Sequence, residues 1–523
     1  MSVSSSSDDG AFARLPSNIL YDIFNLLKPW ELLCLARISE RIQRVSLGIY
    51  YSRRGVDVSP TGVIDITREE DYDLLSLLRI TTFFTKTGHI SVVFVFPKWN
   101  LMENISNLTL ILMRLVSVDM ITLQFRFDPE TCIEEEQRTA LLATEARSPK
   151  NKGLPKALQT LFSTAFRVAT MVRILESEQL FKMVGGNLNN NLTVLPNAPV
   201  INEYKIAAKV HMNKIAQLAH RKQKEKAPTI RHESSIVILD IRSLVLIVPP
   251  LLPWTVTCLN FLSKLRYLSF TTDSDDQVSW GPLLSNLHIP SLVQLTMSSS
   301  SCTLGDLAKF SKRHLRMSVL DIRDFAPLPT EAPKAVNFAF RHLISITAPS
   351  EVLSVFLSYP TEVAPMLKEA HFAITVTEAH PFNLPRARRA LASVIQRLQS
   401  LDVFGLVVVY EVGESPFEKS LEAEEKKQLV PLISMLTLRL DDDLGVNVFG
   451  QLIDWITEFA HIRELRLQSI YPYLYPIQAT LPKNAIGAEE KERRREAFRE
   501  ELTSRLSAME KLEACDLFGK RYP

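Results

Sequence analysis

The sequence predicts an α/β protein in which three short N-terminal helices precede an irregular solenoid of strand–helix units. Apolar residues recur at helical spacing over residues 15–54. Strand-like and helix-like stretches then alternate over residues 55–127. From about residue 236, a leucine pattern recurs every 25–29 residues, a period typical of stacked repeats.

The N-terminal segment has the features of three consecutive amphipathic helices. Apolar residues at 19, 20, 23, 24 and 27 form a wide stripe on one helical face. Pro16 and Pro29 suit the first turns of two helices, because proline lacks the N–H that a helix start leaves unpaired. A third helix is expected from about Ser39. Three such helices cannot bury all their apolar surface among themselves, so part of it should contact another protein or the rest of the chain.

This segment resembles the F-box, the helical module of Skp–cullin–F-box (SCF) ubiquitin ligases. The resemblance lies in Leu15-Pro16, in Ile19-Leu20 followed by Ile23-Phe24, and in the run from Leu32 to Ser39. It implies that residues 14–54 dock on a Skp-family adaptor and, through it, on cullin. The partner-binding residues that it implies are Leu15, Pro16, Ile19, Leu20, Ile23, Leu32, Leu33 and Leu35.

The resemblance covers roughly a tenth of the chain and departs from the common pattern near its end. Gly48 lies where a continuous third helix is expected, and glycine disfavours a helix interior. The alternative is an ordinary N-terminal helical cap on a larger domain.

Composition places the protein among soluble, globular chains. It has 523 residues, enough for two or three domains, and 46% of them are hydrophobic. The net charge of +2 indicates neither nucleic acid nor an acidic membrane as a partner. The five cysteines form no CxxC pair, and the N-terminus lacks the order of a signal peptide. These features predict a cytoplasmic or nuclear protein.

The next regions differ in character. Residues 1–13 are polar and are expected to be disordered. Residues 55–127 read as the first α/β part of the repeat domain, with strands at 63–67, 90–96 and 120–127 and helices at 72–80 and 108–116. Residues 128–232 read as an insertion, with helices at 157–182 and 201–226 joined by a flexible Gly/Asn loop.

Residues 233–523 read as degenerate leucine-rich repeats with a C-terminal cap. The recurring positions are Leu268, Leu295, Leu320, Ile346, Leu436 and Leu465. Helices are expected between strands at 304–312, 352–359 and 444–459, an exposed helix from about 488, and a last strand within 508–517. An F-box followed by irregular repeats resembles the large set of F-box proteins of mushroom-forming fungi. The alternative is an ordinary α/β domain whose strands recur at this interval by chance.

The sequence contains no motif that predicts catalysis, a cofactor or a metal. GxSxG, HExxH and GxxxxGK[ST] are absent. The run Asp441-Asp442-Asp443 is interpreted as a solvated turn or helix start rather than a cation site. The basic segment 205–231 lacks interleaved aromatic residues and is interpreted as a solvated helix face or a nuclear targeting stretch.

The predicted function is therefore that of a non-catalytic substrate-recognition adaptor of an SCF ligase, in which the repeats bind an unknown target protein. The candidate outward strand residues on the repeats are Arg266, Ser269, Gln294 and Thr296. One alternative is an interaction scaffold outside any ligase. The other is an enzyme built on the α/β region, although no cluster of titratable residues favours it.

Overall fold

The computed structural model describes most of the chain. The described residues are 15–67, 71–96, 101–127, 153–175, 234–242, 246, 251–271, 278–297, 300–301, 304–322, 338–376, 382–410, 421, 423–440, 446–469, 493, 496, 500, 502, 504, 505, 509, 511–517 and 520–522. The chain divides into two compact units. Unit 1 comprises Met1–Ser274 and Asn286–Ser291, and unit 2 comprises Asp275–Ser285 and Leu292–Pro523.

Unit 1 starts with three helices and continues with strands and helices in alternation. The helices are α2 (Ser17–Phe24), α3 (Pro29–Leu35), α4 (Glu40–Arg53), α5 (Tyr72–Ile80), α6 (Leu101–Arg114), α8 (Leu154–Val168) and α11 (Leu252–Asn260). The strands are β1 (Val63–Ile66), β2 (Lys86–Phe96), β3 (Ser117–Phe127), β4 (Ala169–Leu175), β5 (Ile238–Ile241) and β6 (Tyr267–Phe270).

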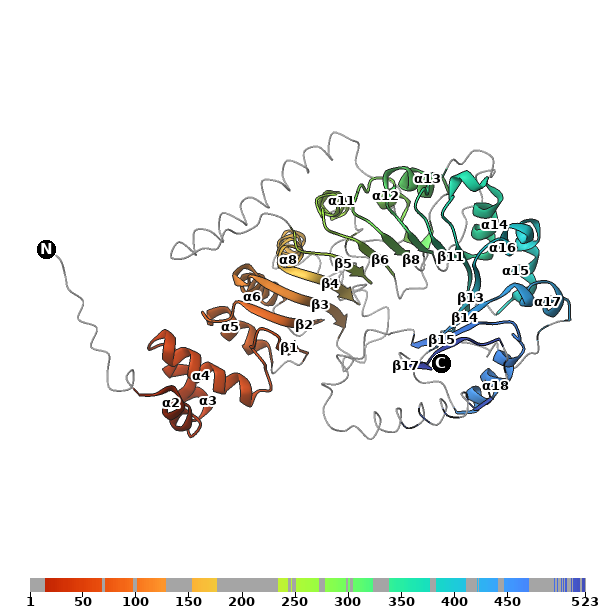
Figure 1. Ribbon diagram of the computed structural model, residues 1–523. Coiled ribbons are helices and arrows are strands. Elements are labelled where there is room, and N and C mark those ends of the chain that lie inside the picture. The colour runs from red at the N-terminus through yellow and green to blue at the C-terminus, as the bar shows by residue number, and fades with distance from the viewer. Residues whose placement is uncertain are drawn as a thin grey trace. The chain divides into compact units, whose positions relative to one another are not determined.

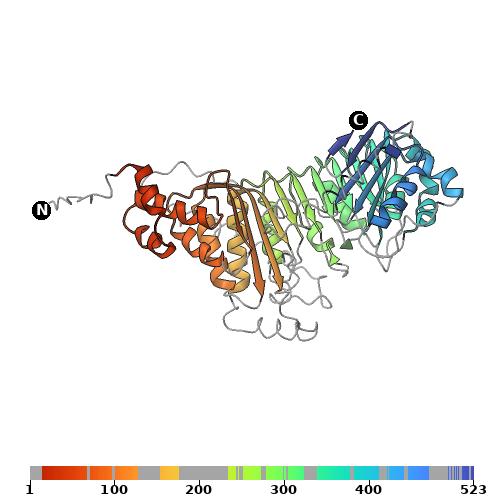
Figure 2. The same ribbon diagram turned by 90° about the horizontal axis from the view of Figure 1, so that it is seen from below.

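The six strands of unit 1 pair in chain order, and every pair is parallel. Figure 1 shows α5, α6 and α8 on one face of β1–β4, and Figure 2 shows these helices and strands as two layers. Aromatic side chains fill the space between the layers. Phe94 stacks on Phe125 at 4.9 Å, and Phe162 from α8 meets Phe125 edge-on. Parallel strands need crossover connections, and these three described helices provide them on one face of the sheet.

The predictions for unit 1 hold for some elements and fail for others. Helix α5 has the predicted bounds, whereas α6 begins at Leu101 rather than 108. The predicted helix over 157–182 is wrong over 169–175, where the chain forms β4, and its last residues, 176–182, lie outside the described residues. Strand β4 pairs with both β3 and β5, so this part of the expected insertion belongs to the sheet. The predicted helix over 201–226 and its Gly/Asn loop lie outside the described residues.

Unit 2 repeats the alternation of strands and connecting helices. Its strands are β7 (Val278–Ser279), β8 (Gln294–Met297), β9 (Ser300–Ser301), β10 (Val319–Ile322), β11 (Ser345–Pro349), β12 (Glu369–Val376), β13 (Val403–Tyr410), β14 (Met435–Leu440), β15 (Glu464–Ser469), β16 (Ala514–Leu517) and β17 (Lys520–Tyr522). Its α-helices are α12 (Gly281–Leu284), α13 (Leu304–Arg313), α14 (Ser350–Ser358), α15 (Leu384–Leu391), α16 (Ile395–Gln399), α17 (Ala423–Gln428) and α18 (Val446–Thr457). Three short 3-10 helices cover Thr361–Val363, Ala392–Val394 and Val430–Leu432.

Strands β8 and β10–β16 form a parallel sheet in chain order, and β17 closes it with an antiparallel pair. Figure 1 shows α14, α15, α16 and α17 on one side of the neighbouring strands. The recurring leucines lie on strands and point into the core. Leu320 pairs with Leu295 and with Ile346, Leu436 pairs with Leu465, and these side chains are at most 1% exposed.

Two central strands of unit 2, β12 and β13, were not predicted. They continue the core ladder with other residue types, since Ile346 pairs with Ala370 and Ala370 pairs with Phe404. The protein is therefore α/β, as the sequence predicts, with an open and largely parallel sheet in each unit.

Candidate functional site

Helices α2, α3 and α4 form a small module, here called the three-helix module, at the start of unit 1. Pro29 is the first residue of α3, and Glu31 accepts a hydrogen bond from the Lys28 backbone N–H at 2.7 Å. Ser39 caps α4 by accepting from the backbone N–H of Ile42. Helix α4 runs unbroken through Gly48 to Arg53, so this glycine does not interrupt it.

The module has a closed apolar core of its own. Leu20, Phe24 and Leu32 have no exposed surface, and Ala36 and Ile42 are almost completely buried. These residues come from all three helices, so the core fixes their packing.

Two arginines of α4 add polar ties to the segments around α2. Arg53 donates to the backbone carbonyls of Leu27 at 2.7 Å and Asn25 at 2.6 Å. Arg41 donates to the carbonyl of Leu15. Both arginines bind backbone carbonyls at the two ends of α2 and so hold these ends against α4.

The same module exposes large apolar side chains. Thirteen large hydrophobic side chains are exposed among the described residues, and five of them fall within residues 19–38. These five are Ile19 (41% exposed), Tyr21 (47%), Leu26 (87%), Trp30 (61%) and Ile38 (64%). Apolar side chains that gather in one short stretch of surface indicate an interaction site, whereas single ones need no explanation.

The structure places the predicted partner-binding residues in three different environments. Leu20 and Leu32 belong to the core and offer no surface for contact. Leu15, Ile23, Leu33 and Leu35 are half-buried, and Pro16 and Ile19 are exposed. The sequence reasoning missed Leu26, Trp30 and Ile38, the three most exposed of the apolar group. The sequence offered one signal for these three residues, which is that none of them lies on the apolar stripe of a helix. Trp30 directly follows Pro29, and Leu26 and Ile38 lie between helices.

The three-helix module is fixed to the α/β part of unit 1 through α4. The buried Tyr51 hydroxyl lies 2.6 Å from Thr81 Oγ1, directly after α5. Gln43 Oε1 accepts a hydrogen bond from the Thr82 hydroxyl at 2.8 Å. Burial raises the pKa of Tyr51 to about 12, because the charged phenolate is poorly solvated there.

The sheet face of unit 1 opposite α5, α6 and α8 carries a polar row. Strand register brings Ser91, Thr122, Arg173 and Asp240 side by side across β2–β5. Next to this row, His89 Nε2 lies 3.1 Å from Thr122 Oγ1. Burial, together with the charge of Arg173, lowers the pKa of His89 to about 4.

The corresponding face of unit 2 carries a second polar group. His371 Nε2 lies 3.8 Å from Glu369 Oε2, and Arg466 Nε lies 2.8 Å from Glu464 Oε1. His371, followed by Ser345, lowers the pKa of Glu369 below its usual value, against the opposite effect of burial. Three of the suggested outward residues, Ser269, Gln294 and Thr296, are half-exposed and alternate with buried neighbours, whereas Arg266 precedes β6. Polar side chains thus line both sheets, but His371 and the named polar residues of unit 1 are at most 8% exposed.

Two other predicted features cannot be placed on the described structure. The run at 441–443 and the basic segment at 205–231 lie outside the described residues. Within the residues that the structure describes, no three His, Cys, Asp or Glu side chains converge as metal ligands would. Over the same residues, no helix has both the length and the apolar character needed to cross a membrane.

Comparison with known proteins gives no relative: no model of a known protein family and no curated protein sequence matches this chain.

Proposed function

We propose that this protein is a substrate-recognition adaptor of an SCF ubiquitin ligase. In this proposal, the three-helix module is an F-box that docks on a Skp-family adaptor. The strand–helix units form an irregular leucine-rich-repeat-like solenoid that holds a target protein in the cytoplasm or nucleus.

One observation carries the proposal: a module with its own closed core exposes Ile19, Tyr21, Leu26, Trp30 and Ile38. The core residues Leu20, Phe24 and Leu32 already stabilise the helices, so the exposed group is not needed for folding. Exposed aromatic and aliphatic side chains on short helices suit docking to the apolar groove of a partner. The motif at residues 15–39, which resembles an F-box, supports a Skp-family adaptor as that partner.

The repeat part of the proposal rests on the buried leucines and on the half-exposed strand residues Ser269, Gln294 and Thr296. Repeated strand–helix units bury their apolar sides against each other and leave a strand face available for binding. The departures from regular repeats are consistent with the degenerate pattern, because Ala370 and Phe404 replace leucine in the core ladder.

The proposed mechanism is proximity rather than catalysis by this chain. Holding a target beside a ubiquitin-conjugating enzyme raises the effective concentration of its lysines. No cofactor is required on this chain.

The test is co-expression of the full chain with a Skp-family adaptor and a cullin, followed by size-exclusion chromatography. A ternary complex is expected. A complex with the adaptor that excludes cullin would instead favour the non-ligase scaffold, and no complex at all would contradict the ligase proposal and leave the scaffold as the alternative. The full chain is needed, because truncation after α4 would remove Tyr51 from its buried contact with Thr81.

A further inference from the structure

A pocket of about 650 Å³ lies at the start of four neighbouring strands of unit 2. Four of its lining residues, Asp402, Ser434, Arg463 and Glu513, each directly precede a strand, β13 to β16 in order. Backbone hydrogen bonds connect them, since Arg463 N–H donates to Ser434 O and Glu513 N–H donates to Arg463 O. The sheet itself therefore fixes the floor of the pocket. The volume of the pocket lies within the range of about 300–1,000 Å³ that is typical of ligand sites.

The basic side chains of this pocket retain unused donors. Lys511 Nζ lies 2.7 Å from His461 Nδ1. A lysine ammonium only donates, so Nδ1 is the acceptor and the remaining ammonium hydrogens stay available. Arg463, exposed, makes no ion pair with any described residue, and its guanidinium therefore adds further donors.

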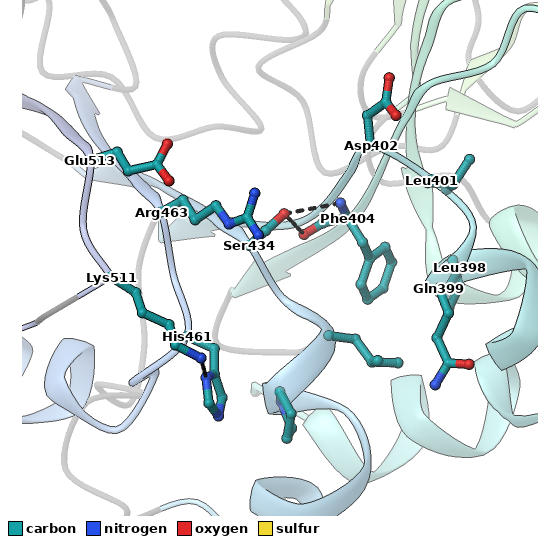
Figure 3. A pocket seen from close by; sticks show the side chains of 12 residues that line it. Leu398, Gln399, Leu401, Asp402, Phe404, Ser434, His461, Arg463, Lys511 and Glu513 are labelled. Carbon is teal, nitrogen blue, oxygen red and sulfur yellow. Dashed lines mark hydrogen bonds between the residues drawn. The ribbon is translucent and has the colours of Figure 1, made fainter.

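Apolar side chains form part of the opposite wall, where Leu398 and Phe404 are almost completely buried and Gln399 also lines the pocket. Figure 3 shows Leu398, Leu401 and Phe404 on one side of the cavity and the Lys511–His461 pair on the other, with Arg463 and Ser434 between them. Asp402 and Glu513 also line the pocket with carboxylates, and that of Asp402 points away from the Lys511–His461 pair in this view. Ser434 is already committed, because its hydroxyl bonds the backbone of Phe404. Charged donors facing an apolar wall are complementary to a carboxylate that stands beside an apolar group.

We infer that this pocket binds a carboxylate of a peptide segment, with Arg463 and Lys511 as the charged donors and a neighbouring apolar side chain on the Leu398–Leu401 wall. The inference rests on the proposed role of unit 2 in holding a target protein, and it assigns the chemistry that this target must present. The carboxylate can belong to an acidic side chain or to a chain terminus, since both offer the same two oxygens.

The test measures binding of labelled peptides to the full chain by fluorescence anisotropy. Each peptide of the first set contains one glutamate and one leucine, the number of residues between them varies across the set, and the C-terminus is amidated. A second peptide set replaces the glutamate by glutamine and carries a free terminal carboxylate, and a third replaces the leucine by serine. The first set binding better than the second assigns an acidic side chain, and the reverse assigns a terminus. Weaker binding of the third set is expected in either case.

Charge removal provides the decisive comparison. The double variant R463Q/K511Q is expected to bind at least about tenfold more weakly, because each charged hydrogen bond is lost. R389Q removes an exposed arginine on α15 and should bind as wild type does. Equal binding by the double variant, no binding by any peptide at millimolar concentration, or equally strong competition by inorganic phosphate would overturn the inference. Adaptor docking depends on residues 19–38, so the two proposals can fail separately.

Discussion

His371 on β12 lies directly over Gly405 on β13, in the space that a side chain on Gly405 would occupy. The two residues are register partners, and a Cβ on Gly405 would lie 2.9 Å from His371 Cε1 and closer still to Nδ1. The backbone of Gly405 thus allows the imidazole to lie flat against the sheet.

This contact predicts that Gly405→Ala destabilises unit 2 by about 1–3 kcal/mol through overpacking. Chemical denaturation of G405A measures the loss. His371→Ala in the same chain should restore most of it, because the clash disappears. Additive effects of the two substitutions would contradict the proposed clash.

His89 predicts a pH dependence of stability in unit 1. Its pKa is about 4 in the folded protein against 6.5 in an unfolded chain, so only the unfolded state gains a proton between these values. Stability is therefore complete above about pH 6.5 and falls as the pH is lowered towards 4. The size of the effect is a few kcal/mol.

The measurement compares denaturation midpoints of the wild type and H89Q across this pH range. Glutamine keeps a polar group near Thr122 but does not titrate, so the difference between the two proteins should shrink as the pH falls. A difference independent of pH would show that His89 is not the group responsible.

Tyr51 predicts the opposite dependence at alkaline pH. Thr81 Oγ1 already donates to the Leu77 carbonyl at 2.9 Å, so the Tyr51 hydroxyl donates to Thr81. Y51F should cost about 1 kcal/mol at neutral pH through loss of this bond.

The folded pKa of Tyr51, about 12, exceeds its unfolded value of 10.0, so its contribution is complete below pH 10 and lost as the pH rises towards 12. Denaturation of wild type and Y51F at pH values between 10 and 12 should show that the stability advantage of the wild type decreases above pH 10. A constant gap would mean that the phenol is not protected by burial.

Leu20 and Leu26 separate the core of the three-helix module from its surface. Leu20 has no exposed area and Leu26 is 87% exposed. Leu20→Ala should destabilise the module by about 2–5 kcal/mol. Leu26→Ala should change stability by less than about 0.5 kcal/mol. Hydrogen exchange of residues 17–53 measures both, and equal protection in the two variants would contradict this division.

Sequence pattern predicts much of this fold because recurring apolar residues mark buried positions. Leu295 and Leu320 lie on paired strands as their spacing indicates. The pattern passes over β12 and β13, because Ala370 and Phe404 occupy the row of Leu320 and Ile346, although Leu406 of β13 does pair with Leu436. The predicted helix beyond Val168 fails because pairing of β4 with two neighbouring strands outweighs local helix preference.

The sequence predicts the helices of the three-helix module, but it does not show which of their apolar residues are exposed and which are buried. Periodicity places Ile19 and Leu20 on the same apolar stripe, and only the packing of the three helices decides that Leu20 is buried and Ile19 is exposed. Trp30 lies off the apolar stripe of α3, so no periodic signal identified it.

The most direct test of the adaptor proposal is the dissociation constant between the full chain and a purified Skp-family adaptor, measured for wild type and L26D/W30D. Both residues are exposed, so the double variant should fold normally, which circular dichroism checks. Met366→Asp is the matched control, because Met366 is 46% exposed in unit 2. The account predicts at least about 100-fold weaker binding for L26D/W30D and unchanged binding for M366D, since apolar anchors contribute most of the affinity of such an interface. A folded L26D/W30D that binds as tightly as the wild type, or a wild type that does not bind the adaptor, would contradict it.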